Sequence, residues 1–261
     1  MKIDPIALVN TVKIQAEKRD EELSEILKHS PPTIKCEIHE QERRLNRHLS
    51  GLHKRAMYSK CDMCVASENE CKSIERLRRA GVPSNLLYAT LDNWLPNSNA
   101  DKSNLEMVKA FAPTRCGFLV MLGDLGTGKS HLAVGVGRQF KSPMYITQGD
   151  LLRRLRSYYR DKTAIDPVDQ AQQADLLILD DMGLSAGGRD EMPMLHNILT
   201  RRYNERKPTI LTGNISLDQL KSLMGERMAD RLKESAYRIL IFGGASHRRE
   251  VRERYFQNDE I

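Results

Sequence analysis

Residues 116–140 read CGFLVMLGDLGTGKSHLAVGVGRQF, and this stretch decides the fold. The apolar run at 116–122 predicts a buried strand, and residues 131–140 predict a helix. Between them, Gly123 to Ser130 matches the pattern G-x-x-x-x-G-K-[ST] at every required position. Glycines let the backbone wrap closely around a phosphate with its N–H groups pointing inward, and the helix that follows directs its positive end at the anion. The stretch therefore predicts a loop that binds the phosphates of a nucleotide.

Each position of this loop has an expected role in binding ATP. Lys129 would reach the β- and γ-phosphates, and the Ser130 hydroxyl would ligate Mg²⁺. The residues expected to contact the nucleotide are Gly123, Leu125, Gly126, Thr127, Gly128, Lys129, Ser130 and His131.

Two more apolar runs extend the pattern along the chain. The runs at 174–179 and 209–212 are short and uninterrupted, as in strands that are buried on both faces. The stretches between the runs are long enough for crossover helices, for example at 131–140 and 190–204. Strands that alternate with helices predict an α/β fold with a parallel sheet flanked by helices.

Polar residues follow both of these runs, where the carboxyl ends of parallel strands would bring them together. Asp180 and Asp181 end the first run, and Asn214 follows the second. We expect Asp180 to lie near Mg²⁺, Asp181 to polarise the attacking water, and Asn214 to orient water against the γ-phosphate. The alternatives are an acidic turn for the pair and an ordinary turn residue for Asn214.

Composition limits the function classes. The 261 residues carry 41 Lys and Arg against 35 Asp and Glu, a net charge of +6 that favours an acidic partner such as nucleic acid. Aromatic residues are 5% of the chain, which argues against an aromatic-rich β-sandwich or barrel. No apolar stretch approaches the roughly 18 residues of a membrane span, and the amino terminus has no secretion signal. We therefore expect a cytoplasmic protein with no membrane partner.

Four of the five cysteines lie within residues 36–71. Cys36 with His39, and Cys61 with Cys64, form two C-x2-C/H pairs that could complete one tetrahedral structural Zn²⁺ site. Closing such a site could fold a segment too small for its own core. Cys71 is an alternative fourth ligand, and reduced cysteines without metal are the other alternative.

The chain divides into two expected parts. Residues 1–80 would form an N-terminal region with a leading helix, at about 5–28, and the zinc module. Residues 81–261 would form the nucleotide-binding domain, with the junction between the two somewhere in 77–99.

A basic segment at 150–162 has a net charge of +3 and an apolar stripe at helical spacing. Charges that follow phosphates and rings that stack on bases suit single-stranded DNA. The expected contacts are Arg153, Arg156, Tyr158, Tyr159 and Arg160. A solvated basic helix is the alternative.

These elements, in this order, resemble the DnaC/DnaI/IstB-like group of AAA+ ATPases over about residues 77–251. The matching segments are LGDLGTGKSHLAVGVG, ADLLILDDMG, RRYNERKPTILTGN, GERMADRLKE and ASHRR. The resemblance implies an AAA+ fold and ATP hydrolysis. It departs at Asp181, where most AAA+ enzymes have glutamate, and at Leu91, where the segment LDNWLP near the base usually begins with phenylalanine.

The resemblance also assigns roles to residues that the pattern alone leaves open. It makes Arg231 the arginine finger that reaches a neighbouring subunit's ATP, with Arg227 as its rival, and Arg248 the sensor-2 arginine. It favours His39 as the fourth zinc ligand. In the related loaders, the position of 150–162 holds a helix that faces single-stranded DNA.

The function that the resemblance implies is ATP-dependent loading of a hexameric replicative helicase onto single-stranded DNA. Residues 1–80 would contact the helicase, and subunits would assemble through Arg231 as an ATP-switched oligomer. The alternatives are an IstB-like transposition helper ATPase, and an adaptor that binds nucleotide without hydrolysing it.

Overall fold

The structure is a computed structural model that describes residues 21, 23–25, 28, 33–35, 42–44, 58–161, 166–183, 191–244 and 246. The chain forms two compact units, Met1–Lys72 and Ser73–Ile261. In the first unit, β1 (Thr33–Lys35) pairs antiparallel with β2 (Glu42–Arg44). Arg43 supports this unit, since its Nε donates a hydrogen bond of 2.7 Å to the carbonyl of Ser59. Helix α3 (Asp62–Arg79) begins in the first unit and ends in the second.

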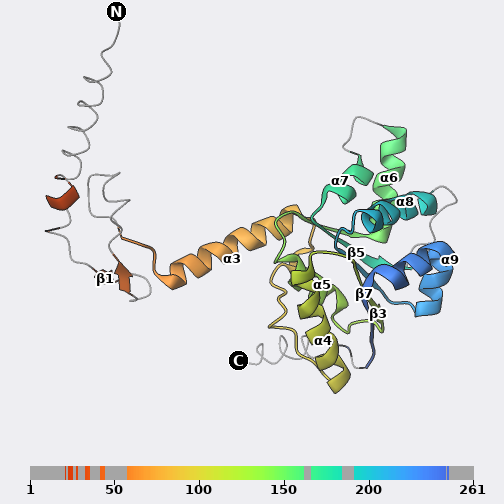
Figure 1. Ribbon diagram of the computed structural model, residues 1–261, viewed down its shortest axis with the longest axis horizontal. Coiled ribbons are helices and arrows are strands. Elements are labelled where there is room, and N and C mark those ends of the chain that lie inside the picture. Colours follow the sequence, from red (N-terminus) through yellow and green to blue (C-terminus); the bar gives the residue numbers. More distant parts are fainter. Residues whose placement is uncertain are drawn as a thin grey trace, which may run out of the picture. The chain divides into compact units, whose positions relative to one another are not determined.

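The second unit is built on a five-stranded parallel sheet with the order β4-β5-β6-β3-β7. Three of these strands, β3, β5 and β7, are labelled in Figure 1. The strands are β3 (Phe118–Gly123), β4 (Pro143–Thr147), β5 (Leu176–Met182), β6 (Thr209–Gly213) and β7 (Ala236–Phe242). The helices are α4 (Asn99–Phe111), α5 (Lys129–Gly137), α6 (Gln148–Arg160), α7 (Pro167–Gln173), α8 (Glu191–Asn204) and α9 (Leu217–Ser235), with 3₁₀ turns η1 (Ser84–Leu86) and η2 (Ala112–Thr114). The predicted α/β fold with a parallel sheet between helices is confirmed.

Both faces of the sheet are covered, which explains the uninterrupted apolar runs. On one face, Leu119 and Met121 belong to a core formed with α4, α5 and residues 77–94. On the other face, Val120 and Leu122 belong to a core formed with α6, α8 and α9. Alternate residues of one strand thus enter opposite cores, so neither set could be polar.

Residues 77–94 are more than the junction that the sequence predicts. Leu77, Leu87 and Trp94 are buried in the first of these cores. The Arg138 guanidinium at the end of α5 donates to the carbonyls of Leu87, at 2.5 Å, and Ala89, at 2.7 Å. This segment is therefore an integral layer of the nucleotide-binding unit.

A fully buried arginine connects α8 to the strands and helices beside it. Arg202 donates to Thr209 Oγ1 at 2.8 Å and to the carbonyls of Ala171, Ala174 and Pro208 at 2.7, 3.0 and 2.6 Å. Burial lowers the pKa of this guanidinium to about 10, which reflects the cost of removing a cation from water. The four hydrogen bonds offset that cost and satisfy carbonyls that the fold would otherwise bury without partners.

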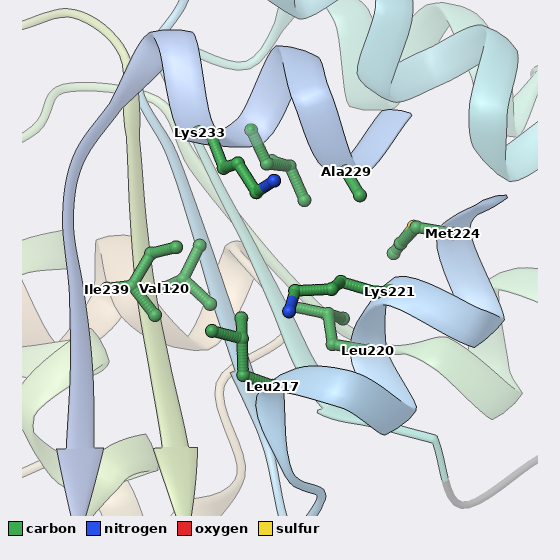
Figure 2. A pocket seen from close by; sticks show the side chains of 9 residues that line it. Val120, Leu217, Leu220, Lys221, Met224, Ala229, Lys233 and Ile239 are labelled. Carbon is green, nitrogen blue, oxygen red and sulfur yellow. The ribbon is translucent and has the colours of Figure 1, made fainter. Parts of the chain in front are cut away.

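Helix α9 is broken at Gly225, whose φ is 71° and ψ is 159°. The two halves lie over β3 and β7 and enclose a cavity of about 20 Å³ (Figure 2). Leu217 and Met224 line it from the first half of the helix, and Ala229 lines it from the second. Of the helices in the described part of the chain, none combines the length and apolar character needed to span a bilayer.

Candidate nucleotide-binding site

The loop between β3 and α5 has the conformation that its glycines predict. Gly123 and Gly128 have φ angles of 120° and 85°, in the left-handed region that favours glycine. A Cβ atom on Gly123 would lie 1.8 Å from the carbonyl oxygen of Phe242, and one on Gly128 would lie 2.1 Å from the indole Nε1 of Trp94. Glycine is therefore required at both positions by backbone angle and by space.

Lys129 lies at the centre of this loop, with 6% of its surface exposed. Its Nζ donates to the carbonyls of Gly123, at 3.0 Å, and Asp124, at 2.6 Å, and to Thr127 Oγ1 at 3.2 Å. These acceptors hold a buried ammonium group at the start of α5, where the helix already favours an anion. The loop therefore presents a fixed positive charge to a phosphate.

Asp180 is the centre of a group of hydroxyls at the carboxyl end of β5. Its Oδ1 accepts hydrogen bonds from Ser130 Oγ, at 2.9 Å, and from Thr212 Oγ1, while its Oδ2 accepts from the hydroxyl of Tyr145. Only 3% of Asp180 is exposed. Burial, and secondly the charge of Asp180, raise the pKa of Tyr145, so Tyr145 remains a hydrogen-bond donor. Ser130 and Asp180, predicted to serve the same metal, are thus brought into direct contact.

Asp181 leaves the regular ladder of the sheet. The register between β5 and β6 shifts between Leu179 and Met182, and Asp181 has a φ of 57°, in the left-handed region. A non-glycine residue in this region costs roughly 1–2 kcal/mol, and such strain concentrates at functional sites. This irregularity in β5 places Asp181 on the wall of a cleft at the carboxyl ends of the strands.

A cleft of about 850 Å³ opens at the carboxyl ends of β3, β5 and β6, where α/β sheets bind ligands. The predicted residues that line it are Leu125, Gly126, Gly128, Lys129, Ser130, His131, Asp180, Asp181 and Asn214. Gly123 and Thr127 do not line it; the Thr127 hydroxyl instead donates to the carbonyl of Asp124 at 3.0 Å and supports the loop. The structure therefore brings the phosphate loop and the three polar residues at the ends of β5 and β6 together in one cleft.

One wall of this cleft is not among the features that the sequence predicts. It consists of residues 83–86 and Tyr88, which is 66% exposed. Leu91 is buried, and its backbone and side chain approach Gly135. Asn93 Oδ1 instead accepts a hydrogen bond of 2.7 Å from His131 Nε2, and its Nδ2 donates to the carbonyl of Tyr88 at 2.9 Å, which fixes the wall to α5. The proline at 83 and the tyrosine at 88 were the available signals, since an exposed ring beside a turn often marks a binding surface.

The residues at this site fit a magnesium ion. Mg²⁺ prefers oxygen ligands and is commonly held by one or two protein side chains together with phosphates and waters. Ser130 and Asp180 supply such oxygens 2.9 Å apart, beside the loop that would hold the phosphates. A hydroxyl that donates its hydrogen to a carboxylate keeps its lone pairs for a cation.

The predicted finger, Arg231, lies outside its own chain's cleft. It is in the second half of α9, where its Nη1 donates to Thr200 Oγ1 at 2.9 Å and its guanidinium lies 5.5 Å from the ring centre of Tyr203. Its rival Arg227 is exposed one turn earlier. Arg248 lies outside the described residues, so its expected role stays a prediction.

Two of the four expected zinc ligands, Cys36 and His39, also lie outside the described residues. Within the described part, no group of three or more metal-binding side chains forms a site. Cys61 is buried, and its sulfur accepts a hydrogen bond of 3.4 Å from the amide of Cys64. Cys71 is seven positions after Cys64 in α3, a rise of about 10 Å, which is too far for two sulfurs on one zinc ion. Zinc binding stays a prediction, and this geometry favours His39 over Cys71.

Helix α6 carries the basic segment. Its apolar stripe, Leu151, Leu152 and Leu155, is buried against the sheet. Its exposed side chains include Arg153, Arg154, Arg156, Tyr159 and Arg160, while Tyr158 is half-buried. Arg153 forms an ion pair with Asp150, and the rings of Tyr158 and Tyr159 meet edge to face at 6.0 Å. The helix therefore has the amphipathic division that the sequence predicts.

Comparisons with known proteins agree with this architecture. The chain is 26% identical over 199 residues to the replicative helicase loader DnaC of Buchnera aphidicola subsp. Acyrthosiphon pisum (strain APS), covering 72% of this chain and 81% of that protein. A crystal structure of the DnaC helicase loader matches with a TM-score of 0.56 at 24% identity, over 62% of this chain and all of that chain. The replication initiator DnaA bound to AMPPCP and single-stranded DNA matches with a TM-score of 0.54 at 18% identity, over 65% of this chain and 55% of that chain.

The chain also matches a family model. The sequence profile of the IstB-like ATP binding proteins matches residues 44–254, which include the phosphate loop, both strand ends and Arg231. The fold is accordingly the α/β P-loop fold of AAA+ proteins. The chain belongs to the IstB-like ATP-binding protein family.

Proposed function

We propose that this chain is a cytoplasmic ATPase that loads a hexameric replicative helicase onto single-stranded DNA. The observation that carries the proposal is the cleft in which Lys129, the Ser130–Asp180 pair and Asn214 meet. The loading role is supported by similarity to proteins named replicative helicase loader DnaC. The match to the Buchnera aphidicola protein covers 72% of this chain.

Different side chains of the cleft would bind the nucleotide and promote its hydrolysis. The loop amides and Lys129 would hold the phosphates, and the exposed ring of Tyr88 would face the base. Mg²⁺, when bound, would neutralise phosphate charge. Asp181 would polarise the attacking water, and Asn214 would orient it against the γ-phosphate. Aspartate is one methylene shorter than the usual glutamate, so we expect slow turnover that suits a switch.

Assembly and partner contacts would use three other regions. Arg231 would reach the ATP of a neighbouring subunit, where a guanidinium offsets charge on the γ-phosphate, and Arg248 would read nucleotide within its own subunit. The basic face of α6 would follow single-stranded DNA. Residues 1–80, with the expected zinc module, would contact the helicase.

The experiment that tests this function is co-purification of the full chain with a hexameric replicative helicase, with ATP and without nucleotide. We expect capture by the wild type that changes with ATP. Lys129→Ala should lose the ATP dependence, because the buried ammonium group is removed from the loop. Its melting temperature serves as a control for folding. No capture of helicase in any nucleotide state would refute the proposal.

A second candidate function is that of a transposition helper ATPase, which the resemblance to the IstB-like group implies as the alternative and which membership of the IstB-like ATP-binding protein family supports. It would use the same cleft, so partner capture separates the two: retrieval of a transposase instead of a helicase would support it. A third candidate, an adaptor that binds ATP without hydrolysis, is favoured if turnover stays at zero with both DNA and helicase present.

A further inference from the structure

Tyr145 contacts the proposed metal site from the edge of the sheet. It lies in β4, where its neighbour in the register of β5 is Ile178, two residues before Asp180. Its ring is buried, with 6% of the residue exposed, and its hydroxyl donates to Asp180 Oδ2. Tyr145 is not among the site residues that the sequence predicts, because a tyrosine inside an apolar strand looks like an ordinary core residue.

The hydroxyl groups around Asp180 divide between its two oxygens. Ser130 and Thr212 both donate to Oδ1, from α5 and from β6, and Tyr145 alone of these three donates to Oδ2. A carboxylate rotates about its last bond unless both oxygens are held. The Tyr145 hydroxyl therefore fixes the plane of the carboxylate, and Oδ1 stays directed at Ser130.

The direction of the Ser130 hydroxyl depends on this arrangement. A serine hydroxyl has one hydrogen and two lone pairs. Because its hydrogen points to Asp180 Oδ1, its lone pairs remain for a cation. A free carboxylate would no longer hold the hydrogen in that direction.

We propose that Tyr145 is a positioning residue for magnesium, which acts by orienting Asp180 and, through it, the Ser130 hydroxyl. The inference rests on the proposed binding of ATP with Mg²⁺ in this cleft. Groups that orient metal ligands typically contribute about 10- to 100-fold to metal affinity.

The test is a titration of MgCl₂ into the full chain with a fluorescent ATP analogue, read as nucleotide binding rather than turnover. For Tyr145→Phe we expect the half-maximal Mg²⁺ concentration to rise about tenfold. Binding of the analogue in EDTA should not change, because the loop and Lys129 are intact. A merely structural role would instead lower the melting temperature and weaken binding in EDTA as well.

Tyr203→Phe is the matched control, since it removes a tyrosine hydroxyl that donates to Glu234 at 2.7 Å outside the cleft. It should leave the magnesium midpoint unchanged. Tyr145→Leu is a second variant without the hydroxyl, and it should show the same shift if Tyr145→Phe folds poorly. An unchanged midpoint in a folded Tyr145 variant overturns the inference, whereas a wild type that binds no nucleotide overturns the proposed function itself.

Discussion

At the scale of single residues, a glycine of the phosphate loop and the glycine at the break in α9 show that backbone angle and space are separate constraints. Gly128 and Gly225 both have positive φ angles, 85° and 71°. A Cβ atom at Gly128 would meet the indole of Trp94, while one at Gly225 would meet nothing within 4 Å. The first glycine is required by its neighbours as well as by its backbone, and the second by its backbone alone.

We therefore predict different results for the same substitution at the two positions. Gly225→Ala should lower the free energy of unfolding by about 1–3 kcal/mol, because a positive φ with a ψ of 159° is a conformation that only glycine adopts readily, and should leave nucleotide binding intact. Gly128→Ala should lower it by about 2–4 kcal/mol, because overpacking adds to the cost of a left-handed alanine, and should also prevent nucleotide binding. Urea unfolding and a nucleotide titration measure both. Normal nucleotide binding by a folded Gly128→Ala variant would contradict the role assigned to Trp94.

At the scale of elements, α6 offers the test of DNA binding. Changing Arg153, Arg156 or Tyr159 to Ala should weaken single-stranded DNA binding and leave nucleotide affinity intact. Each lost arginine contact should make the negative slope of log affinity against log salt shallower by about 0.7. Loss of the tyrosine should instead weaken the binding free energy by about 1–3 kcal/mol, because a ring that stacks on a base is removed. Fluorescence anisotropy at several salt concentrations measures both effects.

Arg79→Ala is the matched control for this experiment. Arg79 is in α3 with 78% of its side chain exposed, so its removal changes the net charge equally. It should leave the salt slope unchanged. Unchanged DNA affinity in all three α6 variants would count against the DNA role of this helix.

The elements also show what sequence can predict and where it stops. The three strands that carry the cleft were predicted because strands covered on both faces are apolar throughout, and glycines or aspartates mark their ends. β4 and β7 were not predicted: β4 is short and starts with Pro143, and β7 follows α9 without a turn. Tyr145 and the wall at Tyr88 were not predicted either, because the contacts that give them a place in the cleft join segments that meet only in the folded chain.

At the scale of the whole molecule, the assembly proposal depends on which arginine of α9 reaches a neighbouring subunit. Arg231→Ala should abolish ATP-dependent self-assembly, measured by sedimentation velocity, while a monomer still binds nucleotide with its usual affinity. Arg227→Ala is the control, since Arg227 is exposed one turn earlier in the same helix. Loss of assembly in Arg227→Ala alone would transfer the role to that residue.

The break in α9 has a consequence for how such proteins can diverge. In an unbroken helix, one inserted residue rotates every later side chain by about 100° about the helix axis, so Arg231 would point in another direction. The residue at 225, with its positive φ, separates the two halves, so a change in the direction of the first half need not rotate the second. Natural variation in length should therefore be tolerated before Leu217 rather than beside the buried Leu220 and Met224, and be penalised between 226 and 231.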